Sequence, residues 1–386
     1  MSASIMSMLR QTNGKIRFLE AHDRISREIV RNVVGDDGQR FHGVWISGLT
    51  QTTYLGIPDT ELISPLKRAS LMIDNLQQND CRPLCAAFDA DSGGNIADIP
   101  ALVELLASKG ISMIVIEDKC VYGPGEKVNS LKETSSLQGQ ANMYEFANII
   151  RSFKSACAHK EMMITARIES FTVRIPKKDE AEEKTSIQDV LRDALMRAEV
   201  YRNAGADAIM IHSKSALPDE VLSFLTKYRS RDSVTPLVVV PTTYSETTEK
   251  VLYDAGANVI IYANHLMRAK ICAMGEFSDK FLAGMPDFIS QDAELGACLE
   301  ARNFGCLSRK MLALKDLGEE AKQYQVLMEK QATENMNAVA KCLLDGKMAS
   351  AADAHIISVR ELLKSNANHI SAVEKLTEES FVGIIF

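Results

Sequence analysis

Residues 113–119 read Met-Ile-Val-Ile-Glu-Asp-Lys, and this stretch decides the fold because an apolar run ends directly in charged side chains. An apolar run of this length, bounded by polar residues, is typical of a buried strand. A β/α barrel keeps its catalytic groups at the C-terminal ends of its strands, which is where Glu117 and Asp118 stand. The stretch therefore favours an α/β fold whose chemistry lies just beyond the end of this strand.

A second polar cluster, Lys-Val-Asn-Ser at residues 127–130, follows Lys119 after a seven-residue spacer that contains Gly and Pro. Gly and Pro indicate a loop, and the cluster supplies a cation together with hydrogen-bond donors. Such a loop suits an anion. Combined with Glu117, it indicates a metal-bound, phosphorylated substrate beneath a mobile loop.

Short apolar runs followed by helical stretches recur along the chain. We expect eight strands, at Arg17–His22, Gly43–Ser47, Leu84–Asp91, Met113–Asp118, Met162–Glu169, Ala208–Ser213, Leu237–Thr242 and Val259–His265. The helical stretches that end at Gly110, Gly205 and Gly256 carry the glycine that commonly closes a helix. Eight βα units within about 250 residues favour an α/β fold of the (β/α)8 TIM-barrel type over an open doubly wound sheet. No GxGxxG fingerprint follows the first strand, which further disfavours a dinucleotide-binding sheet.

The periodicity changes after residue 270, and this change sets the predicted domain organisation. We assign residues 1–290 to the barrel and residues 291–386 to a helical C-terminal segment. The segment has Met, Leu and Ala at helical spacing and no concentration of catalytic residue types, so we expect it to serve packing or oligomerisation. The charged run at residues 177–184 is expected to form a solvated loop insertion on the active-site side.

Composition limits the class of protein. The chain has 386 residues, of which 46% are hydrophobic and 25% charged, and its net charge is −7. This acidic balance does not offer the basic surface that nucleic-acid binding requires. The N-terminus lacks signal-peptide features, and no apolar run approaches the ~18 residues that cross a bilayer. The eight cysteines show no CxxC pair, so we expect reduced thiols and a cytoplasmic location, without nucleic-acid or membrane partners.

Polar groups follow the predicted strands, and three carboxylates among them suit a metal ion. Asp89 and Asp91 lie two residues apart, on the same face of an extended strand, and Glu117 ends the next strand. Three carboxylates at one barrel mouth would repel one another unless a cation lay among them. Oxygen ligands without clustered Cys or His indicate Mg²⁺ or Mn²⁺ rather than zinc. In the structural alternative, Asp91 caps the Gly93-Gly94 turn and Glu117 pairs with Lys119.

Three further strand ends offer groups for the anionic part of a substrate. Residues 47–50, Ser-Gly-Leu-Thr, expose backbone N–H groups that can cradle a phosphoryl oxygen, or they form an ordinary turn. Arg167 interrupts an apolar strand, so it points into the barrel or pairs with a carboxylate, and its guanidinium suits bidentate anion binding. His212 can donate to the same substrate or serve as a structural histidine.

These motifs resemble those of the isocitrate lyase/phosphoenolpyruvate mutase superfamily. The resemblance covers roughly residues 15–270 and rests on Trp45-Ile46-Ser47-Gly48-Leu49, Leu55-Gly56-Ile57-Pro58-Asp59, Asp89-Ala90-Asp91, Glu117-Asp118-Lys119, Lys127-Val128-Asn129-Ser130, Arg167-Ile168-Glu169 and Ala263-Asn264-His265. The lyases of this superfamily carry Lys-Lys-Cys-Gly-His after the fourth strand. Residues 117–122 here read Glu-Asp-Lys-Cys-Val-Tyr, so lyase chemistry through a Cys general acid is disfavoured.

The resemblance implies a barrel whose terminal helix is exchanged between subunits of a homodimer or homotetramer. The implied reaction is the Mg²⁺-dependent interconversion of phosphoenolpyruvate and 3-phosphonopyruvate, small-molecule substrates, which forms the carbon–phosphorus bond that starts phosphonate biosynthesis. The alternative within enzymes is a phosphonopyruvate hydrolase or a related enzyme that cleaves a C–P or C–C bond in an α-keto acid. The alternative of another class is a non-catalytic barrel scaffold.

The resemblance also implies roles for single residues at the barrel mouth. The implied substrate-binding residues are Trp45, Ser47, Gly48, Leu49, Asn129, Ser130, Arg167 and His212. The implied catalytic residues are Asp59, Lys127, Asn129, Arg167 and His212, with Asp59 as nucleophile or orienting residue, and the implied metal ligands are Asp89, Asp91 and Glu117. The loop at residues 119–131 would close to exclude water. Its spacer is longer than in the family, and residues 92–95 read Ser-Gly-Gly-Asn where the family usually has Thr-Gly-Tyr-Gly-Asn.

Overall fold

The computed structural model describes residues 4–55, 63–72, 84–121, 138–173, 186–272, 274, 333, 336–341 and 344–345. Within these ranges, eight parallel strands close into a barrel in the order β1-β10-β9-β8-β7-β4-β3-β2. The strands are β1 (Ile16–Glu20), β2 (Gly43–Ile46), β3 (Cys85–Asp89), β4 (Met113–Glu117), β7 (Met163–Phe171), β8 (Ala208–Ser213), β9 (Leu237–Val239) and β10 (Val259–Tyr262). The predicted (β/α)8 TIM-type barrel is confirmed.

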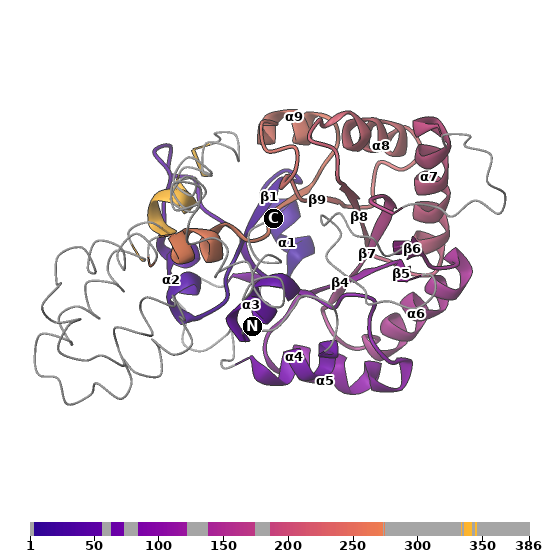
Figure 1. Cartoon of the computed structure of the whole chain (residues 1–386), viewed down its shortest axis with the longest axis horizontal. Coiled ribbons are helices and arrows are strands. Elements are labelled where there is room, and N and C mark those ends of the chain that lie inside the picture. The colour runs from indigo at the N-terminus through magenta and orange to yellow at the C-terminus, as the bar shows by residue number, and fades with distance from the viewer. Residues whose placement is uncertain are drawn as a thin grey trace, which may run out of the picture.

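Helices follow the strands and form a layer around the barrel (Figure 1). They are α2 (Arg24–Asn32), α3 (Gly48–Leu55), α4 (Pro65–Leu71), α5 (Ile99–Ser108), α6 (Met143–Ala156), α7 (Ile187–Asn203), α8 (Asp219–Arg229) and α9 (Glu249–Asp254). A short 3-10 helix (Ile96–Asp98) leads into α5, and two short antiparallel strands, β5 (Lys119–Val121) and β6 (Gln138–Gln140), pair between β4 and α6. The predicted glycines at helix ends are confirmed, because Gly110, Gly205 and Gly256 have left-handed φ angles of 83°, 104° and 113°.

Several strands end earlier than predicted. β3 ends at Asp89 rather than Asp91, and β9 ends at Val239 rather than Thr242. The polar residues beyond these ends leave the strand because their backbone forms local turns. Asp91 has a left-handed φ of 48°, and the Thr242 N–H donates to the Val240 carbonyl at 2.9 Å. The polar strand ends therefore belong to loops at the barrel mouth.

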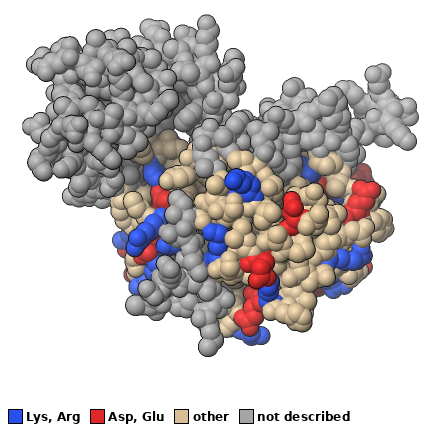
Figure 2. All heavy atoms as spheres, turned by 90° about the horizontal axis from the view of Figure 1, so that it is seen from below, with Lys and Arg blue, Asp and Glu red and all other residues tan. Residues whose placement is uncertain are grey.

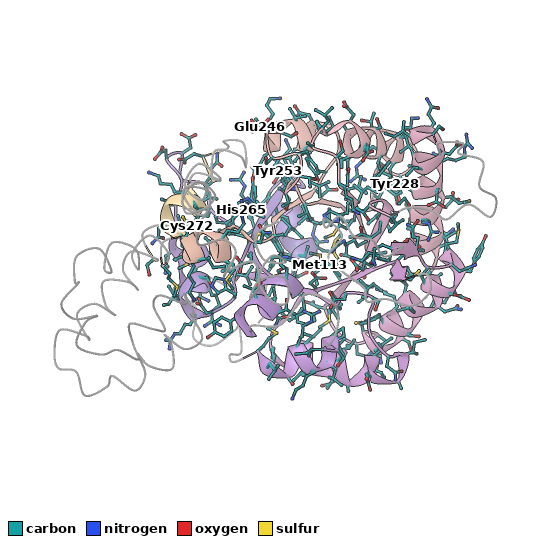
Figure 3. The ribbon with its side chains drawn as sticks, in the orientation of Figure 1. Met113, Tyr228, Glu246, Tyr253, His265 and Cys272 are labelled. Carbon is teal, nitrogen blue, oxygen red and sulfur yellow. The ribbon has the colours of Figure 1, made fainter. Side chains whose placement is uncertain are left out.

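The barrel interior is filled by alternate residues of the strands. This inner cluster includes Ile16, Phe18, Trp45, Cys85, Ala87, Met113, Val115, Met163, Ala208, Met210, Val238, Val259 and Ile261. Because successive side chains of a strand point to opposite faces, the residues between them pack outward against the helices. Figure 3 shows Met113 amid the strands and Tyr228 on α8 in the outer layer.

The N-terminal helix α1 (Ile5–Gln11) closes one end of the barrel. Its buried residues Ile5 and Leu9 join the inner cluster together with Ile16 and Met113, which begin β1 and β4. The helix therefore covers the N-terminal ends of the strands. The polar strand ends lie at the opposite mouth, which is the functional end of this fold.

The described surface carries charges of both signs. On the face drawn in Figure 2, acidic and basic side chains of the described residues lie interspersed. Among the described helices, none is long and apolar enough to cross a membrane. The predicted boundary at residue 290 and the charged run at residues 177–184 lie outside the described residues.

Residues 336–341 and 344–345 pack against the barrel layer near α2, where Figure 1 shows them in yellow. Four apolar side chains of this piece are buried in the outer cluster, and they are Met336, Val339, Ala340 and Leu344. Lys341 Nζ lies 2.7 Å from Asp36 Oδ1, and the Asp36 N–H donates to Asp345 Oδ1 at 2.7 Å. The C-terminal segment therefore contributes apolar surface to the same core as the barrel helices.

We expect Leu344→Ala in the full-length chain to lower the free energy of unfolding by about 2–5 kcal/mol, since the substitution leaves a cavity in a packed core. Leu344 is fully buried, whereas Leu217 is 64% exposed and offers a matched control. Urea unfolding of both variants checks this prediction. Leu217→Ala should stay within about 0.5 kcal/mol of the parent chain. Equal small effects would show that residues 336–341 and 344–345 do not pack on the barrel.

Candidate active site

The alternation that fills the barrel also directs a set of polar side chains into its C-terminal mouth. Inward-facing residues recur every second position along a strand, and these polar side chains occupy the next such positions at the strand ends. They are Asp89, Glu117, Arg167, Glu169 and His212. All of them are largely buried. Burying ionised groups costs free energy unless they are paired, so their mutual arrangement determines the state of the site.

Asp89 and Asp91 form a carboxylate pair next to the start of α3. The Gly48 N–H donates to Asp89 Oδ2 at 3.3 Å, and the Asp91 N–H donates to Asp89 Oδ1 at 3.3 Å. Burial and the neighbouring Asp91 raise the pKa of Asp89 to about 7, although Arg167 and Arg68 oppose this shift. A Cβ atom at position 48 would lie 3.1 Å from Asp91 Oδ1 and 3.4 Å from Asp89 Oδ2. A side chain at position 48 would therefore require the Asp91 carboxylate to shift by a few tenths of an ångström.

Arg68 of α4 is a component of the site that the sequence analysis missed. Its buried guanidinium pairs with the Asp91 carboxylate, donates from Nη2 to the Asp89 carbonyl at 2.7 Å and donates from Nη1 to Gln51 Oε1 at 2.7 Å. Arg68 Cζ also lies 5.2 Å from the ring centroid of Phe88. No local motif marks this arginine, because it reaches Asp89 and Asp91 only through the packing of α4 in the folded barrel.

Arg167 is the central cation of the mouth. Its Nη2 lies 3.1 Å from Glu117 Oε2, and its Nε pairs with Glu169 Oε1. Burial disfavours the guanidinium charge, but Glu169 and Glu117 outweigh burial and raise the pKa of Arg167. The same partnership holds the pKa of Glu169 well below its usual value, against the effect of burial. Of the two expectations for Arg167, pointing into the barrel or pairing with a carboxylate, the structure shows both.

His212 contacts Arg167 directly, and this contact fixes its tautomer. Arg167 Nη2 lies 2.9 Å from His212 Nδ1, and a guanidinium can only donate, so Nδ1 accepts and the ring proton is on Nε2. Glu169 Oε1 lies farther from Nδ1, at 3.4 Å. Burial and the charge of Arg167 lower the pKa of His212, which keeps the ring neutral near pH 7. The Nε2–H group is then a neutral hydrogen-bond donor.

Asp118 anchors the buried polar network behind this site. Its Oδ2 accepts from Tyr201 at 2.6 Å, from Gln140 at 2.9 Å and from Arg197 at 3.1 Å. Its Oδ1 accepts the Glu169 N–H at 3.0 Å. Burial raises the pKa of Asp118 to about 6, while Arg197 and Tyr201 favour the carboxylate. This network joins β4, β6, β7 and α7 at the point where Glu169 enters the mouth.

The remaining described site residues lie at the end of β2. Trp45 is buried in the inner cluster, and its Nε1 has no acceptor among the described residues. Ser47 is buried, and Gly48 and Leu49 begin α3 rather than forming the expected open turn. The backbone N–H groups here therefore belong to a helix N-terminus. One of them, the Gly48 N–H, already donates to Asp89.

Four predicted site residues lie outside the described residues, namely Asp59, Lys127, Asn129 and Ser130. Their roles stay predictions.

The proposed metal ligands do not form a ready-made cage. Among the residues that the structure describes, no group of three or more His, Cys, Asp or Glu side chains gathers as a ligand set. Asp91 is paired with Arg68, and Glu117 lies 3.4 Å from Lys119 Nζ as well as near Arg167. Glu117 therefore makes the ion pair of the structural alternative. Asp89, buried with a raised pKa, remains the carboxylate best placed to take a hard cation, and Mg²⁺ typically uses few direct protein ligands.

Comparisons with known proteins show what the chain is similar to. A family described as phosphoenolpyruvate phosphomutase matches residues 6–282. The chain is 32% identical to the phosphoenolpyruvate phosphomutase of Tetrahymena pyriformis over 262 residues, which cover 67% of this chain and 77% of that protein. It is 30% identical to the phosphonopyruvate hydrolase of Variovorax sp. (strain Pal2) over 238 residues, 61% of this chain and 73% of the relative. A crystal structure of phosphonopyruvate hydrolase with oxalate and Mg²⁺ is 24% identical, with a TM-score of 0.55, over 82% of this chain and 99% of that one.

We expect Asp118→Asn to lower the free energy of unfolding by about 1–3 kcal/mol, because it removes one of the two carboxylates that pair with Arg197, leaving only Asp193. The amide also presents N–H groups to donors that now have no acceptor. Chemical denaturation of the full-length variant gives the value.

The exposed Asp37 supplies a control of the same chemistry, and Asp37→Asn should change the unfolding free energy by less than about 0.5 kcal/mol. If Asp118→Asn were no more costly than Asp37→Asn, the network would not stabilise the fold.

Proposed function

The chain belongs to the phosphoenolpyruvate phosphomutase family, and on this premise we propose that it is an isomerase that interconverts phosphoenolpyruvate and 3-phosphonopyruvate. The observation that carries the proposal is the presence of two buried groups of opposite charge at one barrel mouth. Asp89 supplies a carboxylate for a divalent cation, and Arg167 supplies a guanidinium for the anionic substrate. The reaction would start the synthesis of phosphonates.

The proposed reaction moves a phosphoryl group within one molecule. The O–P bond of phosphoenolpyruvate breaks, the C–P bond of phosphonopyruvate forms at C3, and no other atom is gained or lost. The site must therefore hold the pyruvate enolate in place while the phosphoryl group moves from oxygen to carbon. Phosphoryl transfer requires mainly positioning and electrostatic stabilisation, which buried, mutually fixed charges can supply.

The donor set fits Mg²⁺, with Mn²⁺ as a chemically similar substitute. Asp89 would hold the cation, with Asp91 and Glu117 near it and available through water. When bound, the cation would stabilise the negative charge of the enolate and its carboxylate. The phosphonopyruvate hydrolase crystallised with oxalate and Mg²⁺ supports this proposal, because oxalate resembles the pyruvate enolate in shape and charge.

Arg167 and His212 would bind the phosphoryl group. The two glutamates beside Arg167 hold its guanidinium in one orientation, and the neutral His212 ring donates from Nε2. A neutral donor suits the phosphoryl group, because this group must be held by the site and must also move from oxygen to carbon. We place Ser47 and the Leu49 N–H on the same group, because the N-terminus of α3 favours an anion.

The motif at residues 127–130 favours a mutase over a hydrolase. In the proposal, Lys127, Asn129 and Ser130 close over the phosphoryl group and exclude water, which would otherwise capture it as phosphate. Asp59 would act as nucleophile or orienting residue. Hydrolysis of phosphonopyruvate is the second candidate, since the hydrolase relative has nearly the same identity as the mutase relative. We also propose a homodimer or homotetramer, following the superfamily resemblance.

Phosphorus NMR of phosphonopyruvate incubated with the full-length protein and Mg²⁺ tests the proposed function. We expect a new phosphoenolpyruvate resonance to grow with time, because the phosphoryl group stays within the molecule. A parallel sample of Asn129→Ala should convert substrate at least about tenfold more slowly if this amide binds the phosphoryl group. Inorganic phosphate together with pyruvate, without phosphoenolpyruvate, would overturn the mutase in favour of the hydrolase.

Mg²⁺ binding should also depend on pH. Because the pKa of metal-free Asp89 is raised to about 7, this carboxyl is mostly protonated at pH 6 and mostly ionised at pH 8. The cation competes with the proton, so its affinity should be about tenfold weaker at pH 6 than at pH 8. Isothermal titration calorimetry at the two pH values measures the difference. Asp89→Asn should abolish both binding and its pH dependence, and equal wild-type affinities at pH 6 and pH 8 would refute the assignment.

A further inference from the structure

Arg68 pairs with the carboxylate of Asp91 but makes no direct contact with the carboxylate of Asp89. Its Nη2 pairs with Asp91 Oδ2 and also donates to the main-chain oxygen of Asp89, not to the Asp89 carboxylate. Its Nη1 donates to Gln51 on α3, so the guanidinium is fixed between α3 and the loop after β3. Only 1% of the Arg68 side chain is exposed, so water competes little for these contacts.

The Asp89 carboxylate is positioned by other groups. Two backbone N–H groups, those of Gly48 and Asp91, donate to its two oxygens. Backbone donors leave lone pairs free on both oxygens, because each carboxylate oxygen can accept more than one contact. The two aspartates therefore differ in their direct partners. Asp91 forms an ion pair with Arg68, whereas no described cationic side chain pairs directly with the Asp89 carboxylate, on which Arg167 and Arg68 act from farther away.

We propose that Arg68 is a positioning residue that keeps Asp91 from contacting the divalent cation directly, so that Asp89 alone of the two aspartates coordinates it. This inference rests on the proposed Mg²⁺-dependent function and assigns one residue to a task within it. Arg68 pairs with Asp91 Oδ2 and so limits how far this carboxylate can turn toward the cation. The exclusion leaves a coordination position for a water molecule or for an oxygen of the substrate.

Without Arg68, the Asp91 carboxylate would be released beside a divalent cation. A second direct carboxylate strengthens binding, because affinity for hard cations rises with the charge of the ligands. The same change would remove a coordination position that substrate needs. Tighter metal binding with slower turnover is therefore the expected signature, and a merely structural arginine would not produce it.

The experiment uses Mn²⁺ as the probe on the full-length protein. Electron paramagnetic resonance of free Mn²⁺ gives the affinity, and water proton relaxation gives the number of water molecules on the bound ion. Arg68→Met should bind Mn²⁺ about tenfold more tightly and with about one water fewer than the parent chain. Its turnover with phosphonopyruvate should fall at least about tenfold.

Matched variants distinguish a specific effect on metal binding from a general disturbance of the fold. Arg68→Lys keeps the charge beside Asp91, so its Mn²⁺ affinity should stay within about threefold of the parent value. The double variant Arg68→Met/Asp91→Asn lacks the released carboxylate and should lose the gain in affinity. Unchanged affinity and water number in Arg68→Met, or weaker binding, would overturn the proposal.

Asp91→Asn keeps the proposal testable if Arg68→Met does not fold, as judged by loss of cooperative unfolding. Because Asp91 does not touch the cation in this scheme, Asp91→Asn should leave the number of bound water molecules unchanged. One additional water on Mn²⁺ would identify Asp91 as a direct ligand and overturn the assignment. If the parent chain bound no Mn²⁺ at all, the metal-dependent function itself would fail, which is a different result.

Discussion

The charges at the C-terminal mouth must compensate one another, because the barrel buries them almost completely. Arg167 lies between Glu117 and Glu169, and Arg68 pairs with Asp91, so each buried cation has a carboxylate partner. Every pair orients the groups in it, since a guanidinium fork accepts few geometries. Asp89 lies outside these pairs, and burial together with Asp91 raises its pKa, so an added cation would offset the cost of ionising this carboxyl group. The pairing therefore creates both rigidity and one site of unbalanced negative charge.

The barrel and most of its mouth could be predicted from the sequence because both follow from one periodicity. Alternation places every second residue of a strand inside, so Glu117 and Arg167 could be assigned to the mouth from their distance to apolar neighbours. The last residue of each strand was harder to predict. A polar residue such as Asp91 continues the two-residue pattern of the sequence, although its backbone has already left the strand conformation. Arg68 could not be found in this way, because its contact with Asp91 crosses 23 residues and depends on the packing of a helix.

The Asp118 network explains why the stretch at residues 113–119 has so much influence on the site. Glu117 points into the mouth, whereas its neighbour Asp118 points behind it and accepts hydrogen bonds from Tyr201 and from the Glu169 backbone. Glu117, the last residue of β4, thus serves the proposed chemistry, and Asp118, the residue after it, supports the site from behind. The support is what keeps Glu169, and through it Arg167, at a fixed place relative to β4.

The contacts of residues 336–341 and 344–345 with Arg17 and Asp36 have a consequence for how the protein is made. Arg17 Nη1 donates to the Leu344 carbonyl at 3.4 Å across a sequence separation of 327 residues. At synthesis rates of about 5–20 residues per second, Leu344 is translated roughly 16–65 s after Arg17. During that interval the apolar surface around α2 is uncovered on a nascent chain. This face of the core can therefore be completed only after β10 has closed the barrel and the C-terminal segment has been translated.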